Sequence, residues 1–198
     1  MPSPIGHILG GVAAAWLVDL LPGRRDGRTL PTGARWFNRA GNGLTAVCAA
    51  LAVSPDLDLL FQTHRTVTHS VAAVFAVGLV AAAVAANAGR PIARVAAICA
   101  AAYGSHLLLD LMAADRFLPR GLQALWPFSE TWFIVEWEVF GQIQRRAPLS
   151  GPSLLQNARA IGRELAILLP IVVVVWSVRV KALAGLSAEV SGGDHPPQ

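Results

Sequence analysis

Five stretches of the chain are dominated by apolar residues, and shorter polar segments separate them. They cover about 4–21, 44–60, 67–88, 92–113 and 164–183. Residues 66–89 contain no Asp, Glu, Lys or Arg, and an apolar run of this length can cross a bilayer as a helix. The pattern predicts an all-α fold, an integral membrane bundle of about five apolar helices.

The first stretch has the signals of a helix that stays in the protein. Ser3 and Pro4 are suited to the N-cap and the first helical position, and Pro22-Gly23 is suited to the stop. The segment lacks the basic leading residues of a signal peptide, so we interpret it as a short hydrophobic helix.

The longest connection, residues 114–163, contains the sequence SETWFIVEWEVF. Its aromatic residues Phe133, Trp137 and Phe140 recur at helical spacing, with Glu130, Glu136 and Glu138 interspersed. This pattern predicts a helix that lies in the membrane interface with its aromatic side chains towards the lipid. Packing of the same segment on the membrane domain is the alternative. We expect one domain over residues 1–185 and a disordered tail over 186–198.

Composition supports a membrane location. Hydrophobic residues make up 54% of the chain and charged residues 14%, whereas soluble domains average about 25% charged residues. The net charge is +4, and the basic residues form no dense run with interleaved aromatic residues, which argues against nucleic acid as a partner. Cys48 and Cys99 both sit in apolar runs and are predicted to be small buried residues.

Polar residues collect in four short islands. Apart from His195 in the tail, every histidine lies in one of them: SPIGH (His7), SPDLDLL (Asp56, Asp58), HRTVTHS (His64, His69) and SHLLLD (His106, Asp110). A chain that crosses the membrane at each apolar helix brings all four islands to the same face. His106 and Asp110 also share one face of a helix. A hydrogen bond between helices would explain this pair alone, but not the convergence of the islands.

The converging residue types are ligands for a metal ion. Imidazole and carboxylate groups suit Zn, Mn or Fe, and the lack of thiolates argues against a closed structural zinc site. Seven candidates exceed the number of ligands that one ion takes. Either two ions bind, or some of these residues hydrogen-bond to the ligands or serve as general base instead of binding the ion. Arg65 could clamp an anionic substrate, or it could face lipid headgroups. Thr68 and Ser70 could orient His69 or cap a helix.

Five segments of the chain together resemble a known family. The segments SPIGHILGG, PDLD, HRTVTHS, GSHLLLD and LWPFS, in this order, resemble the membrane-bound metal-dependent hydrolases of the YdjM-like group. This group is also labelled LexA-binding, inner-membrane-associated hydrolases. The resemblance covers residues 1–135 and implies a bacterial inner-membrane protein with metal-dependent hydrolase activity.

The family is similar in its His/Asp order to the zinc phospholipase C and P1 nuclease group, which is all-helical and cleaves phosphate esters. This similarity implies metal ligation by His7, Asp56, His69, His106 and Asp110. The chain departs from the pattern after Asp110, where LMAADRFLPRG replaces an expected Thr-Pro turn, and no further His-x-x-x-Asp pair follows. A three-metal site is therefore not expected.

These observations predict a membrane-embedded metal-dependent hydrolase of phosphoesters, with a lipid or lipid-linked substrate. Asp58 is the predicted general base, with His64 beside the ligands and Arg65 near the substrate. Two alternatives remain open at this stage. One is a non-catalytic membrane protein whose metal site is structural or regulatory, which includes binding of a LexA-type repressor as the family label suggests. The other is a metal or proton transporter, for which ligands near mid-membrane are expected.

The basic residues predict the orientation in the membrane. Nine arginine and lysine residues fall on the face away from the islands and seven on the face with them. Six of the seven lie in the fifty-residue connection, and long loops count less in the positive-inside rule. We therefore expect a multi-pass inner-membrane protein whose basic 22–43 loop is cytoplasmic and whose site opens to the periplasmic side.

Overall fold

The computed structural model describes residues 1–22, 43–61, 64–145 and 150–192. Within these ranges the protein has five α-helices and no β-strand. The helices are α1 (Pro4–Leu20), α3 (Gly43–Val53), α4 (Val71–Asn87), α5 (Ile92–Leu111) and α6 (Gly151–Gly192). Two 3₁₀ segments, η2 (Ser54–Phe61) and η3 (Val67–His69), complete the list of elements. The predicted all-α fold is confirmed.

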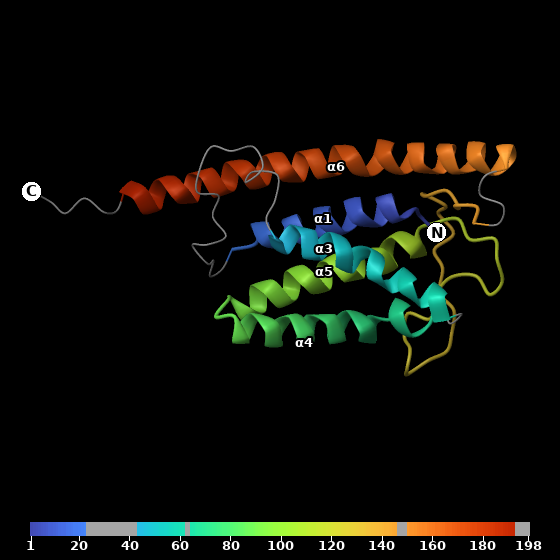
Figure 1. Ribbon diagram of the computed structural model, residues 1–198, viewed down its shortest axis with the longest axis horizontal. Helices are drawn as coiled ribbons and strands as arrows, with labels where there is room; N and C mark the ends of the chain where they lie inside the picture. The colour runs from blue at the N-terminus through green and yellow to red at the C-terminus, as the bar shows by residue number, and fades with distance from the viewer. Residues whose placement is uncertain (23–42, 62–63, 146–149, 193–198) are drawn as a thin grey trace, which may run out of the picture.

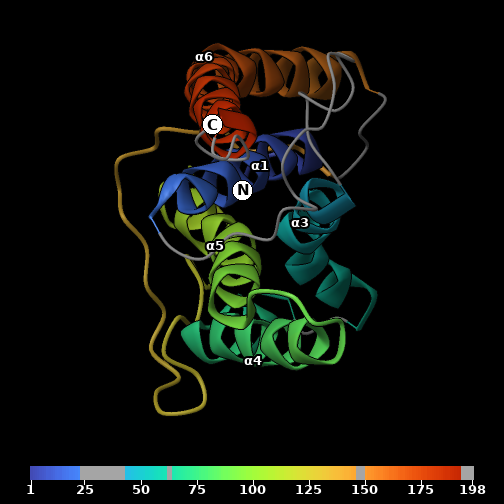
Figure 2. The same cartoon turned by 90° about the vertical axis from the view of Figure 1, so that its left-hand side faces the viewer.

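The helices run lengthwise beside one another, with α1 at the centre (Figure 1). Helix α1 packs against α3, α5 and α6, and α4 packs on the outer side of α5. The end-on view shows the order α6, α1, α5 and α4 across the bundle, with α3 to one side (Figure 2). Cys48 and Cys99 meet inside the contact of α1, α3 and α5, and both are buried as predicted.

Close approach between α1 and α3 depends on small side chains. A Cβ atom placed on Gly11 would lie only 2.2 Å from the Cβ of Ala52. Small residues let helix backbones pack this closely, which is common between membrane helices. The contact holds against α1 the end of α3, from which η2 continues.

Three segments are long and apolar enough to cross a membrane: Gly43–Leu60, Ile92–Leu111 and Gly151–Ala182. Helices α1 and α4 are apolar but shorter. Helix α4 turns large apolar residues outward, and Phe75 and Leu79 are 70% and 72% exposed. A continuous apolar outer face suits lipid better than water.

Local chemistry explains where the helices begin and end. Ser3 caps α1 by accepting a hydrogen bond from the backbone N–H of Gly6, and Pro4 follows at the first helical position. The predicted second helix changes at Ser54-Pro55 into the 3₁₀ segment η2, because Pro55 has no N–H for the helical ladder. Helix α4 begins at Val71, after its cap Ser70, rather than at residue 67.

The last helix is much longer than hydropathy predicts. It begins at Gly151 instead of 164 and continues to Gly192, so the expected boundary of a disordered tail at 186 falls inside it. Residues 193–198, including His195, lie outside the described residues. Polar residues in its first turns hid this part of the helix from a search for apolar runs.

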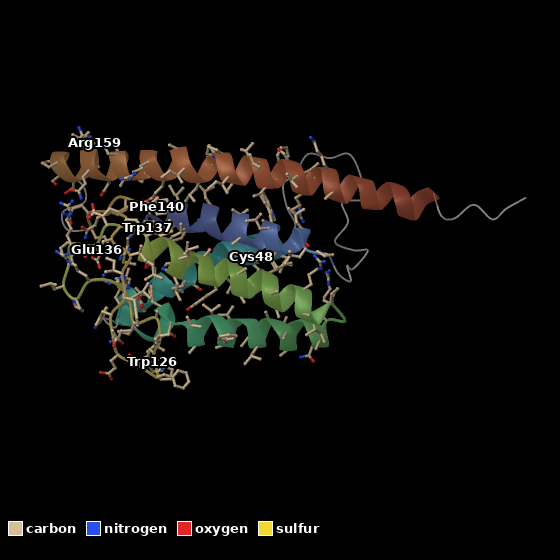
Figure 3. All side chains as sticks on the ribbon, turned by 180° about the vertical axis from the view of Figure 1, so that it is seen from behind. Cys48, Trp126, Glu136, Trp137, Phe140 and Arg159 are labelled. Carbon is tan, nitrogen blue, oxygen red and sulfur yellow. The ribbon has the colours of Figure 1, made fainter. Side chains whose placement is uncertain are left out.

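The predicted interfacial helix is wrong. Residues 130–140 contain no helix, and their backbone instead bonds to other segments. The N–H groups of Val135 and Val139 donate to the carbonyls of Leu111 and Met112 at the end of α5, at 2.9 and 2.8 Å. Aromatic and β-branched residues favour such extended backbone. The segment crosses one end of the bundle, where Phe140, Trp137 and Glu136 lie near one another and Trp126 lies at the far edge of the same end (Figure 3).

Candidate metal centre

All the candidate residues lie at one end of the bundle, the end that holds the N-terminus and the start of α6 (Figure 1). Four segments contribute them: the first turns of α1, η2, the region of η3, and the last turns of α5. The corresponding residues are His7, then Asp56 and Asp58, then His64 and His69, then His106 and Asp110.

The five predicted ligands form one cluster, which we call the five-residue cluster: His7, Asp56, His69, His106 and Asp110. The Asp110 carboxylate lies at its centre. Its Oδ1 is 3.4 Å from Nε2 of His7, and its Oδ2 is 3.5 Å from Nε2 of His69 and 3.4 Å from Nε2 of His106. Oδ1 of Asp56 lies 3.8 and 3.7 Å from the Nε2 atoms of His69 and His106. These two nitrogen atoms are 3.1 Å apart.

The spacing matches the edges of a coordination polyhedron. Metal–ligand bonds of about 2.0–2.2 Å separate neighbouring ligand atoms by roughly 3.0–3.5 Å in octahedral or tetrahedral geometry. Two sets of three residues, His7 with His106 and Asp110, and Asp56 with His64 and His69, each bring their ligand atoms within 4.8 Å of one another. The residues can thus hold one or two ions.

Burial without hydrogen bonding sets the cluster apart from a structural His–Asp network. His7, His69 and His106 are completely buried and Asp110 is 5% exposed. Both ring nitrogen atoms of His7, both carboxylate oxygen atoms of Asp110 and Oδ1 of Asp56 are buried without a hydrogen-bond partner. Charge-assisted hydrogen bonds measure about 2.7–2.9 Å, so contacts of 3.4–3.8 Å do not satisfy these atoms. A hydrogen bond that joins two helices therefore does not explain the arrangement.

Neighbouring groups orient two of the imidazoles. Nδ1 of His106 donates to the carbonyl of Ala52 at 2.8 Å, which leaves Nε2 as the lone-pair atom that faces the cluster. Nδ1 of His69 lies 3.1 Å from Oδ2 of Asp58, and its Nε2 faces the cluster. Burial opposes a charge on His69, but the Asp56 and Asp58 carboxylates outweigh burial and raise its pKa to about 9. The carboxylates of this region thus attract positive charge.

The sequence as a whole supports a membrane protein of one family. A family model described as YdjM inner membrane protein matches residues 1–184. The chain belongs to the YdjM inner membrane protein family. The match extends past residue 135, the limit of the resemblance in the sequence motifs, and includes α6 through Ala182. No curated protein and no solved structure matches the chain.

In this YdjM family member, Asp58 is bonded to several neighbours. Its Oδ1 accepts a hydrogen bond from Nδ1 of His64 at 2.7 Å, and its Oδ2 accepts from the backbone N–H of Arg65 at 3.1 Å and from Oγ1 of Thr68 at 2.7 Å. Oδ2 also lies 3.1 Å from Nδ1 of His69. Asp58 therefore fixes the two neighbouring histidines, and its role as a general base stays a prediction.

His64 lies at the outer edge of the cluster. Its side chain is 18% exposed, its ring centroid is 5.1 Å from that of His69, and its Nδ1 is bound to Asp58. The predicted anion clamp, Arg65, has a positive φ of 68° and directs its guanidinium to Asp115. Asp115 also accepts the backbone N–H groups of Phe117 and Gly121. The Arg65 side chain is therefore held by an acidic partner.

Sequence reasoning missed Arg145 and Glu164. Nη2 of Arg145 lies 3.4 Å from Oδ2 of Asp56, on the side of that carboxylate away from the cluster. Glu164 on α6 is completely buried and accepts hydrogen bonds from the backbone N–H (2.8 Å) and the hydroxyl of Ser3. It thereby anchors the turn that carries His7. A lone acidic residue at the start of the fifth apolar run was the available signal for Glu164. No pattern in the sequence marks Arg145.

A cavity of about 210 Å³ lies beside His64, at the outer edge of the cluster. His64, Arg65, Asp115 and Arg145 line it, together with apolar residues that include Leu59 and Phe117. Two guanidinium groups and one imidazole therefore face a space beside the candidate ligands.

Proposed function

We propose that this protein is a membrane-embedded, metal-dependent hydrolase of phosphoesters. One observation carries the proposal: three imidazoles and two carboxylates from four segments converge at ligand spacing, with buried atoms that lack hydrogen-bond partners. Burial of such unsatisfied polar groups costs several kcal/mol if nothing binds them. The donor set of nitrogen and oxygen atoms fits Zn, Mn or Fe, with Zn favoured by the three imidazoles.

A bound ion would lower the pKa of a coordinated water towards neutrality and polarise a phosphoryl oxygen. The residues of the chain supply the remaining parts. His64 is the best placed group to take a proton. It lies at the cavity, Asp58 fixes its Nδ1 at 2.7 Å, and its Nε2 faces the Met1 side chain, whose Sδ lies 2.9 Å away and which lines the same cavity. This Asp–His pair has the arrangement of a general base with its orienting carboxylate.

The cavity beside the cluster suits an anionic group. Arg65 and Arg145 both line it, and only Asp115 among its described lining residues is acidic. Arginine binds phosphate through paired N–H groups. We infer that Arg145, whose side chain is 39% exposed, provides the more adaptable contact, since Asp115 already binds Arg65.

Large apolar side chains at the same end support a lipid or lipid-linked substrate. Leu118, Phe128 and Trp137 are 86%, 91% and 72% exposed. They lie in the connection between α5 and α6, which crosses the end of the bundle near the cluster (Figure 1). Aromatic residues at the ends of membrane helices are typical of the headgroup region. A substrate embedded in the same leaflet would reach the cavity from the side.

The position of the cluster distinguishes this proposal from a transporter. Ion pathways place their ligands near mid-membrane, whereas these residues gather where α1 begins and α5 ends. The alternative function, which includes repressor binding, is a non-catalytic protein with a regulatory metal site. Such a protein would bind metal without turnover.

The experiment combines metal analysis with an activity screen. Detergent-purified protein is assayed for bound Zn, Mn and Fe, and then tested on a phosphate monoester, a phosphate diester and phospholipid micelles. We expect about one or two ions per chain and chelator-sensitive hydrolysis of at least one substrate. His64→Asn should retain the ion held by His7, His106 and Asp110 and lose most of the turnover. Metal binding without hydrolysis of any of these substrates would favour the regulatory alternative, and protein that takes up no ion would refute the proposal.

We further propose that the protein spans the inner membrane several times with the cluster on the periplasmic side. Thr131 and Asn87 are exposed at opposite ends of the bundle, and both native cysteines are buried. In intact cells, Thr131→Cys should react with a membrane-impermeant thiol reagent and Asn87→Cys should not. The reverse pattern would place the cluster in the cytoplasm.

A further inference from the structure

A second cavity lies at the opposite end of the bundle from the five-residue cluster. Its volume is about 480 Å³, within the range of ~300–1,000 Å³ that is usual for small-molecule sites. It is bounded by the last turns of α1, the first turns of α3, the connection of α4 to α5, and Arg179 of α6. These helix ends meet at one end of the bundle in Figure 1.

The walls of this cavity combine two kinds of chemistry. Most of the lining residues are apolar, and they include Trp16, Leu44, Val47, Val95 and Ile98. Three arginines also line it, namely Arg90, Arg94 and Arg179, and among the described lining residues only Asp19 is acidic. An apolar pocket with a cationic side thus opens where the helices end.

Asp19 is shared by two of the arginines. Nε of Arg179 lies 3.0 Å from its Oδ2, and Nη1 of Arg94 lies 3.2 Å from its Oδ1. Arg94 also donates to the carbonyls of Asp19 and Leu21 at 2.8 and 2.7 Å, and Arg179 lies over the ring of Trp16 at 5.8 Å. The described lining thus gathers three guanidinium groups around one carboxylate. Arg179 is only 4% exposed, and a nearly buried cation is favoured by an additional anion.

We propose that this cavity binds an anionic phospholipid, with its phosphate beside the three arginines and one acyl chain along the apolar wall. The three guanidinium groups favour a phosphodiester whose headgroup adds no cation, such as a glycerol headgroup, over a zwitterionic one. The apolar walls select a lipid over free phosphate, which would gain nothing from Leu44 or Ile98. Basic pockets between membrane helices commonly hold lipid headgroups in this way.

The bound lipid would link the helices that meet at this end. Its phosphate would contact side chains from α5, α6 and the connection before α5, and its chain would cover α3 and the end of α4. This site is separate from the five-residue cluster and does not depend on the proposed hydrolase activity. Binding should therefore raise thermal stability without a change in metal content.

Delipidated protein in a neutral detergent provides the test. The midpoint of thermal unfolding and lipid binding by native mass spectrometry are measured with phosphatidylglycerol, with phosphatidylcholine of the same chains, and with inorganic phosphate. We expect phosphatidylglycerol to bind at least tenfold more tightly than phosphatidylcholine and to raise the unfolding midpoint. Inorganic phosphate should do neither. Equal binding of the two lipids, or an equal effect of inorganic phosphate, would overturn the proposal.

Two variants test the two halves of the site. Arg90→Gln removes one of the three charges and should weaken phosphatidylglycerol binding about tenfold. Arg116→Gln, an exposed position at the other end of the bundle and outside the cavity, is the matched control and should bind as the wild type does. Val84→Trp fills the apolar part from an exposed position and keeps every arginine, so it should also weaken the lipid. Wild-type binding by both Arg90→Gln and Val84→Trp would refute the site.

Discussion

Replacement of Asp110 by Asn is the sharpest test of the proposed metal centre, because this carboxylate lies within 3.5 Å of three imidazole nitrogen atoms. The amide preserves the shape of the side chain but removes the negative charge that offsets a cation. Zinc binding at structural zinc sites of small domains is worth about 10–16 kcal/mol in total, which serves here as the scale. Shared among five ligands, this gives ~2–3 kcal/mol for each, or a loss of roughly 30- to 200-fold in affinity. The loss for Asp110→Asn should be at the upper end of this range of affinity, since both oxygen atoms of Asp110 face the cluster.

The assay is competition between the protein and a chromophoric chelator in detergent, with helix content followed by circular dichroism. Asp115→Asn is the matched control, because Asp115 is also a buried carboxylate but bonds to Arg65 and backbone N–H groups outside the cluster. We expect it to keep the affinity of the wild type. Equal affinity of Asp110→Asn and wild type, or an equal loss in the control, would refute the assignment. Loss of folding in Asp110→Asn, together with a wild type that takes up no ion, would restore the hydrogen-bonded helix pair as the explanation.

Three further variants test the packing and the cavity. Gly11→Ala should destabilise the protein by about 1–3 kcal/mol, because the new methyl group would lie 2.2 Å from Ala52. The control Gly162→Ala, which meets no atom within 4 Å, should raise the unfolding temperature slightly; equal effects of the two would contradict the close contact. Glu164→Gln should lower the free energy of unfolding by about 1–3 kcal/mol, because it weakens two buried hydrogen bonds from Ser3. An unchanged midpoint of thermal or chemical unfolding would show that this anchor is dispensable. Arg145→Gln should raise KM for a phosphoester at least several-fold with unchanged metal content, and loss of metal instead would assign Arg145 to support of Asp56.

The apolar runs predicted the helix ends correctly where those ends depend on interactions within a few residues. The caps at Ser3 and Ser70 and the break at Pro55 follow from hydrogen bonds and backbone limits within a few residues. The segment around Trp137 was assigned to a helix because its aromatic spacing fits one. Its backbone pairs instead with the end of α5, and no local pattern encodes such a partner. The early start of α6 was missed for a related reason, since hydropathy does not detect its polar first turns.

The sequence by itself determined which residues could form the candidate centre. Histidine and aspartate are costly in apolar helices, so their positions in four islands stand out, and alternation of the helices places the islands at one end. Only the tertiary structure decided their roles. Whether Asp58 faces a water or holds His64 depends on angles and distances set by the packing of η2 against η3. The path of the chain after α5 places Asp115 beside Arg65. Contacts of Arg145 and Glu164 join residues 89 and 161 positions apart in the chain. Such long-range contacts depend on how the helices pack, and for this reason no single segment of the sequence predicts them.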